Sequence, residues 1–85
     1  MPFDYDEQIL ETLAGHGLVP LPTTTPQRLR DALRDLYRYE IRELRQSLLA
    51  GKIERRNYAD HVIQLRKRYW LLSLPLPHWT KRSAG

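Results

Sequence analysis

The chain has 85 residues and a formal net charge of +4, which allow one small domain, residues 1–85, with a single modest core. Hydrophobic residues make up 41% and charged residues 28%, the balance of a globular protein, and there is no cysteine for a disulfide, a thiolate metal site or a thiol nucleophile. No apolar run reaches the roughly 18 residues of a membrane span, and the N-terminus is acidic where a signal peptide is basic. We therefore expect a soluble, cytoplasmic protein.

The first predicted helix covers about residues 4–14. Asp4 is expected to cap it, with Glu7 three residues later as in a capping box. Its apolar side is formed by Tyr5, Ile9 and Leu13. Gly15 and Gly17 provide the stop, since glycine adopts the left-handed conformation at little cost. The following segment, residues 18–26, carries three large aliphatic side chains between prolines, which predicts an extended connection packed on the domain.

The second predicted helix is the longest and covers about residues 25–50. Thr24 or Thr25 is its expected N-cap, Pro26 suits the first turn, and Gly51 ends it. Apolar side chains recur at spacings of three and four residues: Leu33, Tyr37, Ile41, Leu44 and Leu48.

The third predicted helix covers about residues 54–72. Ile53 and Tyr58 have the spacing of a hydrophobic staple around a cap at Glu54. A heptad-like apolar seam is formed by Tyr58, Val62, Leu65, Tyr69 and Leu72, and it is expected to carry the stability. Two prolines, Pro75 and Pro77, prevent the helix from continuing. The tail after it is expected to be extended, with Leu74, Leu76 and Trp79 packing back and residues 80–85 frayed.

A very short turn joins the second and third helices, so they are expected to run antiparallel. The predicted fold is all-α: a long antiparallel helical hairpin, 25–50 and 54–72, with a short N-terminal helix and a proline-containing extended tail. Residues whose numbers sum to about 105 should face each other, for example Leu44 with Val62 and Tyr37 with Tyr69.

Residues 44–66 read LRQSLLAGKIERRNYADHVIQLR, with leucines, then Gly51 and Ile53 at the turn, then Tyr58 opening the next helix. This cadence resembles the short bacterial helical hairpin called the SHOCT domain. Glu54 and Asn57 stand where that family has a threonine cap and a glutamate, so its capping box is lost. The resemblance implies an interaction or oligomerisation module of a bacterial protein and supplies no catalytic residue.

Residues typical of catalytic or metal sites are sparse. None of the histidines, His16, His61 and His78, pairs with another at helical spacing, and there is no cysteine to complete a metal site. Gly15 and Gly17 bracket a segment too short for a phosphate loop, and no serine lies in a nucleophile elbow. We therefore expect no enzyme activity, no cofactor and no metal.

The positive charge is concentrated after the first helix. Residues 1–27 carry four acidic and no basic side chains, whereas residues 28–85 carry all 14 basic ones. One set, the arginine ridge, repeats along the second helix: Arg30, Arg34, Arg38, Arg42 and Arg45. A second set, Arg66, Lys67 and Arg68, precedes Trp70. Such sets suit phosphate contacts and base stacking. We favour the interpretation that these basic side chains face solvent, with Asp31–Arg34 and Asp35–Arg38 ion pairs. The acidic N-terminal segment would then pack on the basic helices and offset part of their charge.

A second apolar line on the third helix consists of Ala59, Ile63 and Trp70. Another segment is expected to shield this apolar line from water: the first helix, the tail around Trp79, or a second chain. We take Ala59, Ile63, Trp70 and Trp79 as the candidate partner interface.

Glu40 lies within the apolar arc of the second helix, where a carboxylate is costly unless it is paired. We expect a partly buried pair with Arg68 that fixes the register of the two helices, with the Tyr69 hydroxyl as a second donor. The alternative is a Glu40 with a raised pKa at an interface or small pocket.

The expected function is a non-catalytic protein-interaction or oligomerisation module, such as a homodimer. The alternative is a nucleic-acid or polyanion binder, and no membrane partner is expected.

Overall fold

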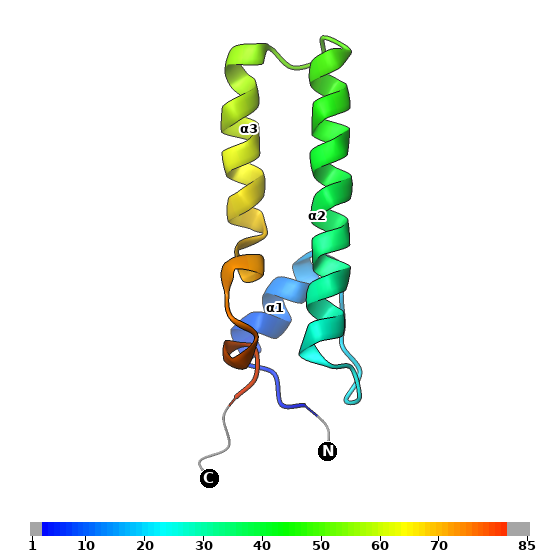
Figure 1. Ribbon diagram of the computed structural model, residues 1–85. Helices are drawn as coiled ribbons and strands as arrows, with labels where there is room; N and C mark the ends of the chain where they lie inside the picture. The colour runs from blue at the N-terminus through cyan, green and yellow to red at the C-terminus, as the bar shows by residue number, and fades with distance from the viewer. Residues whose placement is uncertain (1–2, 82–85) are drawn as a thin grey trace.

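The computed structural model describes residues 3–81. It contains three α-helices, α1 (Glu7–Gly15), α2 (Pro26–Leu49) and α3 (Arg55–Arg68), followed by two 3-10 turns, η1 (Trp70–Ser73) and η2 (Leu76–His78). Helices α2 and α3 lie side by side and are joined at one end by a short connection, and α1 and the η turns gather at the other end (Figure 1). The expectation of an all-α fold is confirmed for these residues, where the only strand-like feature is one isolated bridge.

Helix α2 has the predicted bounds because its local signals are strong. The Thr25 side chain accepts a hydrogen bond from the Arg28 backbone N–H at 3.2 Å, so Thr25 rather than Thr24 is the cap. Pro26 occupies the first helical position, where its missing N–H is not needed. Gly51 follows the helix with φ +75°, a left-handed conformation that favours glycine and turns the chain toward α3.

Helix α1 starts three residues later than predicted, so the expected cap at Asp4 is wrong. Asp6 is the N-cap, and its carboxylate accepts a hydrogen bond from the Gln8 N–H at 2.9 Å. Residues 4–6 do not join the helix because their backbone pairs with the tail. The Asp6 N–H donates to the Trp79 carbonyl at 3.3 Å, and the Lys81 N–H donates to the Asp4 carbonyl at 2.7 Å.

The same pairing corrects the expectation that the chain frays from residue 80. Tyr5 and Thr80 form an isolated antiparallel bridge, and the Tyr5 hydroxyl donates to the Thr24 carbonyl. The start of the chain, the tail and the connection before α2 are therefore tied together. The rest of the segment predicted to fray, residues 82–85, lies outside the described residues.

Helix α3 ends at Arg68, four residues before the predicted end. After Tyr69 the chain tightens into η1, which changes the direction of the side chains that follow. Leu71 is completely buried, whereas the predicted core residue Leu72 is only half-buried. The tail is also not simply extended, because η2 folds Trp79 back into the core and its indole N–H donates to the Leu74 carbonyl at 3.1 Å.

The predicted cap of α3 is only partly realised. Glu54 occupies the N-cap position but makes no side-chain capping hydrogen bond. Its carboxylate instead pairs with the Arg56 guanidinium at 2.6 Å. Ile53 and Tyr58 of the expected staple are both half-buried. The start of α3 therefore depends on apolar contacts more than on capping.

The hydrophobic core lies at the end of the molecule that contains α1 and the tail. Its buried members are Tyr5, Ile9, Leu13, Leu29, Leu33, Leu65, Tyr69, Leu71 and Trp79. From Arg34 to Gln64 no residue is buried. We call this segment, residues 34–64, the arm. The predicted apolar seam is therefore only half correct, since Leu65 and Tyr69 are buried but Tyr58, Val62 and Leu72 are half-buried.

Candidate functional site

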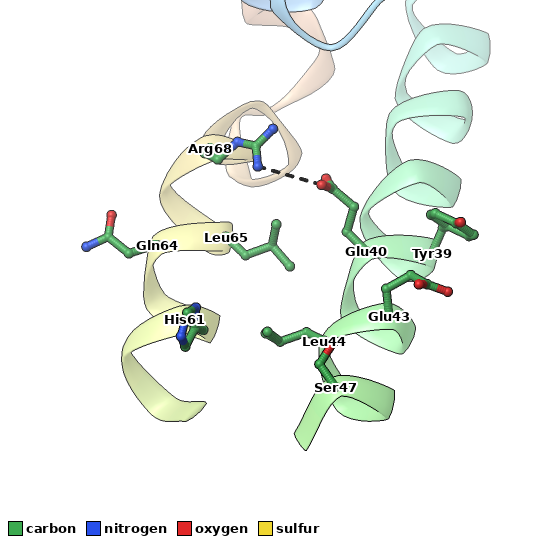
Figure 2. A pocket seen from close by; sticks show the side chains of 9 residues that line it. All are labelled: Tyr39, Glu40, Glu43, Leu44, Ser47, His61, Gln64, Leu65 and Arg68. Atoms are coloured by element: carbon green, nitrogen blue, oxygen red, sulfur yellow. Dashed lines mark ion pairs between the residues drawn. The ribbon is translucent and has the colours of Figure 1, made fainter. Parts of the chain in front are cut away.

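A cluster of polar contacts surrounds Glu40, near the junction of the arm and the core. The Tyr69 hydroxyl donates a hydrogen bond to the Glu40 carboxylate, and Arg68 Nη1 lies 3.6 Å from Glu40 Oε1 (Figure 2). Both predicted partners of Glu40 are thus in contact with it. The Glu40 side chain is 32% exposed and that of Arg68 is 61% exposed, so the arginine is not buried as expected. An exposed ion pair with this separation contributes about 0–1 kcal/mol to stability, so the hydrogen bond from Tyr69 is the stronger interaction of Glu40.

His16 joins this cluster, although the glycines on either side of it predict only a turn. Its Nε2 lies 2.8 Å from the Arg68 carbonyl oxygen, and its ring centroid lies 4.3 Å from that of Tyr69. A histidine N–H that donates to this carbonyl satisfies one of the free acceptors at the end of α3. The glycines around His16 indicate the turn, but Arg68 lies 52 positions away in the chain, and no local pattern indicates this contact.

Tyr69 is the central residue of the cluster. Its ring contacts those of His16 and Tyr37, the latter at a centroid distance of 5.3 Å, in agreement with the predicted pairing of Tyr37 and Tyr69. Burial raises the pKa of the Tyr69 hydroxyl far above its ordinary value of 10, and the hydrogen bond to Glu40 and the negative charge of Glu40 raise it further against the opposing effect of Arg68. Tyr69 is therefore a protonated hydrogen-bond donor at neutral pH.

We expect the raised pKa of Tyr69 to make the protein less stable in alkali. Below pH 10 both the folded and the unfolded chain keep this proton, and the stabilisation is fully present. Above pH 10 the unfolded tyrosine ionises first, so the free energy of unfolding falls by up to about 1.4 kcal/mol per pH unit. Urea unfolding at pH 9 and pH 11 measures this slope. Tyr69→Phe should make it shallower, whereas Tyr39→Phe, which changes an exposed ring, should leave it unchanged. An equal slope in native protein and Tyr69→Phe would contradict the assignment.

An open groove of about 450 Å³ runs between α2 and α3 and includes Glu40 and Arg68 of this cluster. Its lining residues are Tyr39, Glu40, Glu43, Leu44, Ser47, His61, Gln64, Leu65 and Arg68. In Figure 2, Leu44 and Leu65 point into the gap between the helices, Glu40 and Arg68 approach each other across it, and Gln64 points away from it. No hydrogen bond links Ser47, His61 and Glu43 within the described part of the chain.

The arginine ridge is split between packing and solvent. Arg30 is half-buried and donates to the Leu72 carbonyl at 3.3 Å, so it helps to hold η1. The predicted Asp31–Arg34 pair is present at 2.7 Å, but no ion pair joins Asp35 to Arg38 among residues 3–81. That prediction is wrong because two exposed side chains gain little from holding each other in water. The remaining basic candidates are all exposed: Arg38, Arg42, Arg45, Arg66, Lys67 and Arg68.

Replacing Arg34, Arg38 and Arg42 together by Gln is expected to leave the fold intact. All three side chains are exposed, and each exposed ion pair contributes roughly 0–1 kcal/mol. Circular dichroism should be unchanged, and the urea midpoint should move only slightly. A large loss of helicity would show that this part of the ridge has a structural role.

The four residues of the candidate partner interface do not form one surface. Ala59 is exposed and Ile63 is 48% exposed, so neither α1 nor the tail covers them. Trp79 is 0% exposed within the core, so its assignment to a partner surface is wrong. Trp70 is half-buried and packs against the core. The physical reason is the early end of α3, because η1 turns Trp70 away from the line through Ala59 and Ile63.

No family model, curated protein or solved structure matches this chain. None of the helices in residues 3–81 is long and apolar enough to cross a membrane. Within the same residues, no group of three or more His, Cys, Asp or Glu side chains is placed to hold a metal ion.

Proposed function

We propose that the protein is a cytoplasmic, non-catalytic helical module that binds another protein through its arm. The observation that carries the proposal is the position of the core. Every buried residue lies before Arg34 or after Gln64. Leu36, Tyr37 and Ile41 at the near end of the arm pack against the core but are only half-buried, so the arm buries no residue of its own. The structure measures 53 × 19 × 17 Å along its principal axes, so the molecule is elongated.

The arm is nevertheless rich in apolar side chains. Its half-buried members are Leu36, Tyr37, Ile41, Leu44, Leu48, Ile53, Tyr58 and Val62. Leu49 is 77% exposed and Ile63 is 48% exposed. Two helices in an antiparallel hairpin cover only one stripe of each other, and the remaining apolar surface favours a further helix or sheet. The SHOCT-type resemblance of residues 44–66 covers this segment and implies the same class of function.

A structural role for the Glu40 cluster supports the non-catalytic part of the proposal. Glu40 accepts from Tyr69 and lies beside Arg68, and His16 is engaged with the Arg68 carbonyl. A general base needs a free acceptor that faces a bound substrate. These groups instead bond to one another across α1, α2 and α3, which fixes how the arm leaves the core.

Site-specific photocrosslinking in cells that naturally make the protein tests the proposal. A photoreactive residue at Ile63 or Leu49 on the arm should form crosslinks to a protein. The same residue at Val19, which is 80% exposed but lies outside the arm, is the matched control and should not. Equal crosslinking at Val19, or none from the arm, would overturn the proposal.

Polyanion binding is the second candidate function, because Arg38, Arg42, Arg45, Arg66 and Lys67 form no ion pair within the described residues. Binding of mixed-sequence oligonucleotides at two salt concentrations tests it. Electrostatic binding to phosphates must weaken steeply as salt rises. Salt-sensitive binding that is lost on replacing these residues would favour this function over the first.

A further inference from the structure

We propose that the arm binds an acidic amphipathic helix on one particular side, which we call the basic face. This inference rests on the proposed function and specifies the surface and the partner chemistry. The basic face has an apolar centre formed by the half-buried side chains of Ile41, Leu48 and Val62. Its rim is formed by Arg38 and Arg45 of α2 and Arg55 and Arg66 of α3.

The two sides of the arm are assigned by their angular position relative to the residues that lie between its helices. Leu44 and Leu65 point into that gap (Figure 2). With about 100° between successive residues, Glu40, Glu43 and Ser47 fall on one side of Leu44, and Ile41, Arg45 and Leu48 fall on the other.

The same count on α3 separates two groups of residues around Leu65. His61, Gln64 and Arg68 lie on the side of the groove drawn in Figure 2, whereas Val62 and Arg66 lie on the basic face with Ala59. A hollow of about 320 Å³ lined by Tyr37, Arg66, Tyr69, Leu72 and Ser73 continues the basic face toward the core. The basic face therefore runs along the arm and ends in a partly apolar hollow.

Charge is separated between the two sides. The acidic residues of the two helices within the arm, Asp35, Glu40, Glu43 and Asp60, all fall outside the basic face on the same helical count. Arg38, Arg45, Arg55 and Arg66 are exposed and form no ion pair in the described part of the chain. A partner with carboxylates on either side of an apolar stripe would place the stripe on the centre and the carboxylates on the rim.

The core already holds a helix from an acidic segment of the chain, through apolar contacts. Residues 1–27 carry acidic side chains and no basic ones, and α1 lies within that segment. Ile9 and Leu13 of α1 are buried in the core with Leu29 and Leu33 of α2 and Leu65 of α3. An acidic amphipathic helix is therefore a suitable occupant for the remaining, distal length of the same two basic helices.

Two other occupants fit this face less well. A nucleic acid would pair with the arginines but leave the aliphatic centre uncovered, and base stacking needs exposed aromatic rings. Among residues 3–81 the exposed Phe, Tyr and Trp side chains are Phe3 and Tyr39, and Tyr39 lines the opposite groove. A second copy related by a two-fold axis would bring two arginine rims together, which is repulsive.

Binding of designed helical peptides tests the inference. The probe is a fluorescent peptide with leucines at positions i, i+3, i+4 and i+7 and glutamates elsewhere, and its partner probe carries lysines in place of the glutamates. The glutamate peptide should bind the native protein and the lysine peptide should not. Arg45→Glu with Arg66→Glu should weaken binding at least about tenfold. Arg42→Glu with Lys67→Glu, the same charge change on the outer sides of the helices, is the matched control and should stay within about twofold.

Circular dichroism shows whether each variant is folded, and Arg45→Gln with Arg66→Gln replaces the charge reversal if that variant unfolds. Equal binding of both peptides, or equal loss in both double variants, would overturn the inference. So would an oligonucleotide that binds through Arg45 and Arg66 when the glutamate peptide does not, or light scattering that shows a dimer through this face. If any of these contradicting results is obtained while a photoreactive residue at Ile63 still crosslinks to a protein, the inferred partner chemistry is wrong and the proposed function stands. Loss of the crosslinks overturns both.

Discussion

Trp79→Ala is expected to destabilise the protein by about 3–5 kcal/mol, the cost of removing a fully buried aromatic side chain. Trp79 is 0% exposed, and its indole N–H donates to the Leu74 carbonyl. Its own carbonyl accepts from Asp6, so the residue also anchors the start of the chain. A domain of this size has a net stability of only several kcal/mol, so the variant should be largely unfolded at room temperature.

Urea unfolding followed by circular dichroism measures this effect, with Trp79→Phe as an intermediate variant that keeps most of the apolar volume. Val19→Ala is the control, because Val19 is exposed and its truncation should change the stability by less than about 0.5 kcal/mol. A cost below about 1 kcal/mol for Trp79→Ala would show that the tail is not docked in the core.

Leu65→Ala is expected to cost roughly 2–5 kcal/mol. Leu65 is the point at which α3 enters the core, and it packs there with Leu33, Tyr69 and other buried residues. The cost includes the lost transfer free energy and the cavity left where the surrounding side chains cannot close.

Leu48→Ala on the arm is the matched comparison, because it removes the same atoms from a half-buried position. It should cost clearly less than Leu65→Ala, since less apolar surface leaves water there on folding. A cost below about half a kcal/mol for Leu65→Ala would mean that this residue faces water. Equal costs for the two variants would mean that the arm is buried in solution, for instance against a second copy.

Local signals in the sequence were sufficient for α2 and for the turn after it. Thr25, Pro26 and Gly51 act on the backbone within a few residues, and the structure places each of them as predicted. The contact between Glu40 and its partners was also predictable, because a carboxylate in an apolar arc needs a donor from the facing helix.

The errors occur where distant segments compete with local preferences. The sequence pattern favours Asp4 as a cap, yet residues 4–6 remain extended. Their backbone hydrogen bonds with Trp79 and Lys81 stabilise the fold more than one further helical turn would. The pattern through Leu72 continues the heptad spacing, but burial of Leu71 and Trp79 favours a tighter turn after Tyr69. His16 lies beside Arg68 only because of the tertiary fold, so no local sequence pattern indicates its place in the Glu40 cluster.

The sequence by itself determined the helical class, the long second helix and its turn, because these depend on propensity, capping and apolar spacing within one segment. Only the tertiary structure decided that the core gathers α1, the tail and one end of the α2–α3 pair, and leaves the arm without a buried residue. Apolar spacing shows which side of a helix avoids water, but it does not show which other segment arrives to cover it. That choice depends on the summed contacts of the whole chain, and here Trp79, Leu71 and Tyr5 cover one end only.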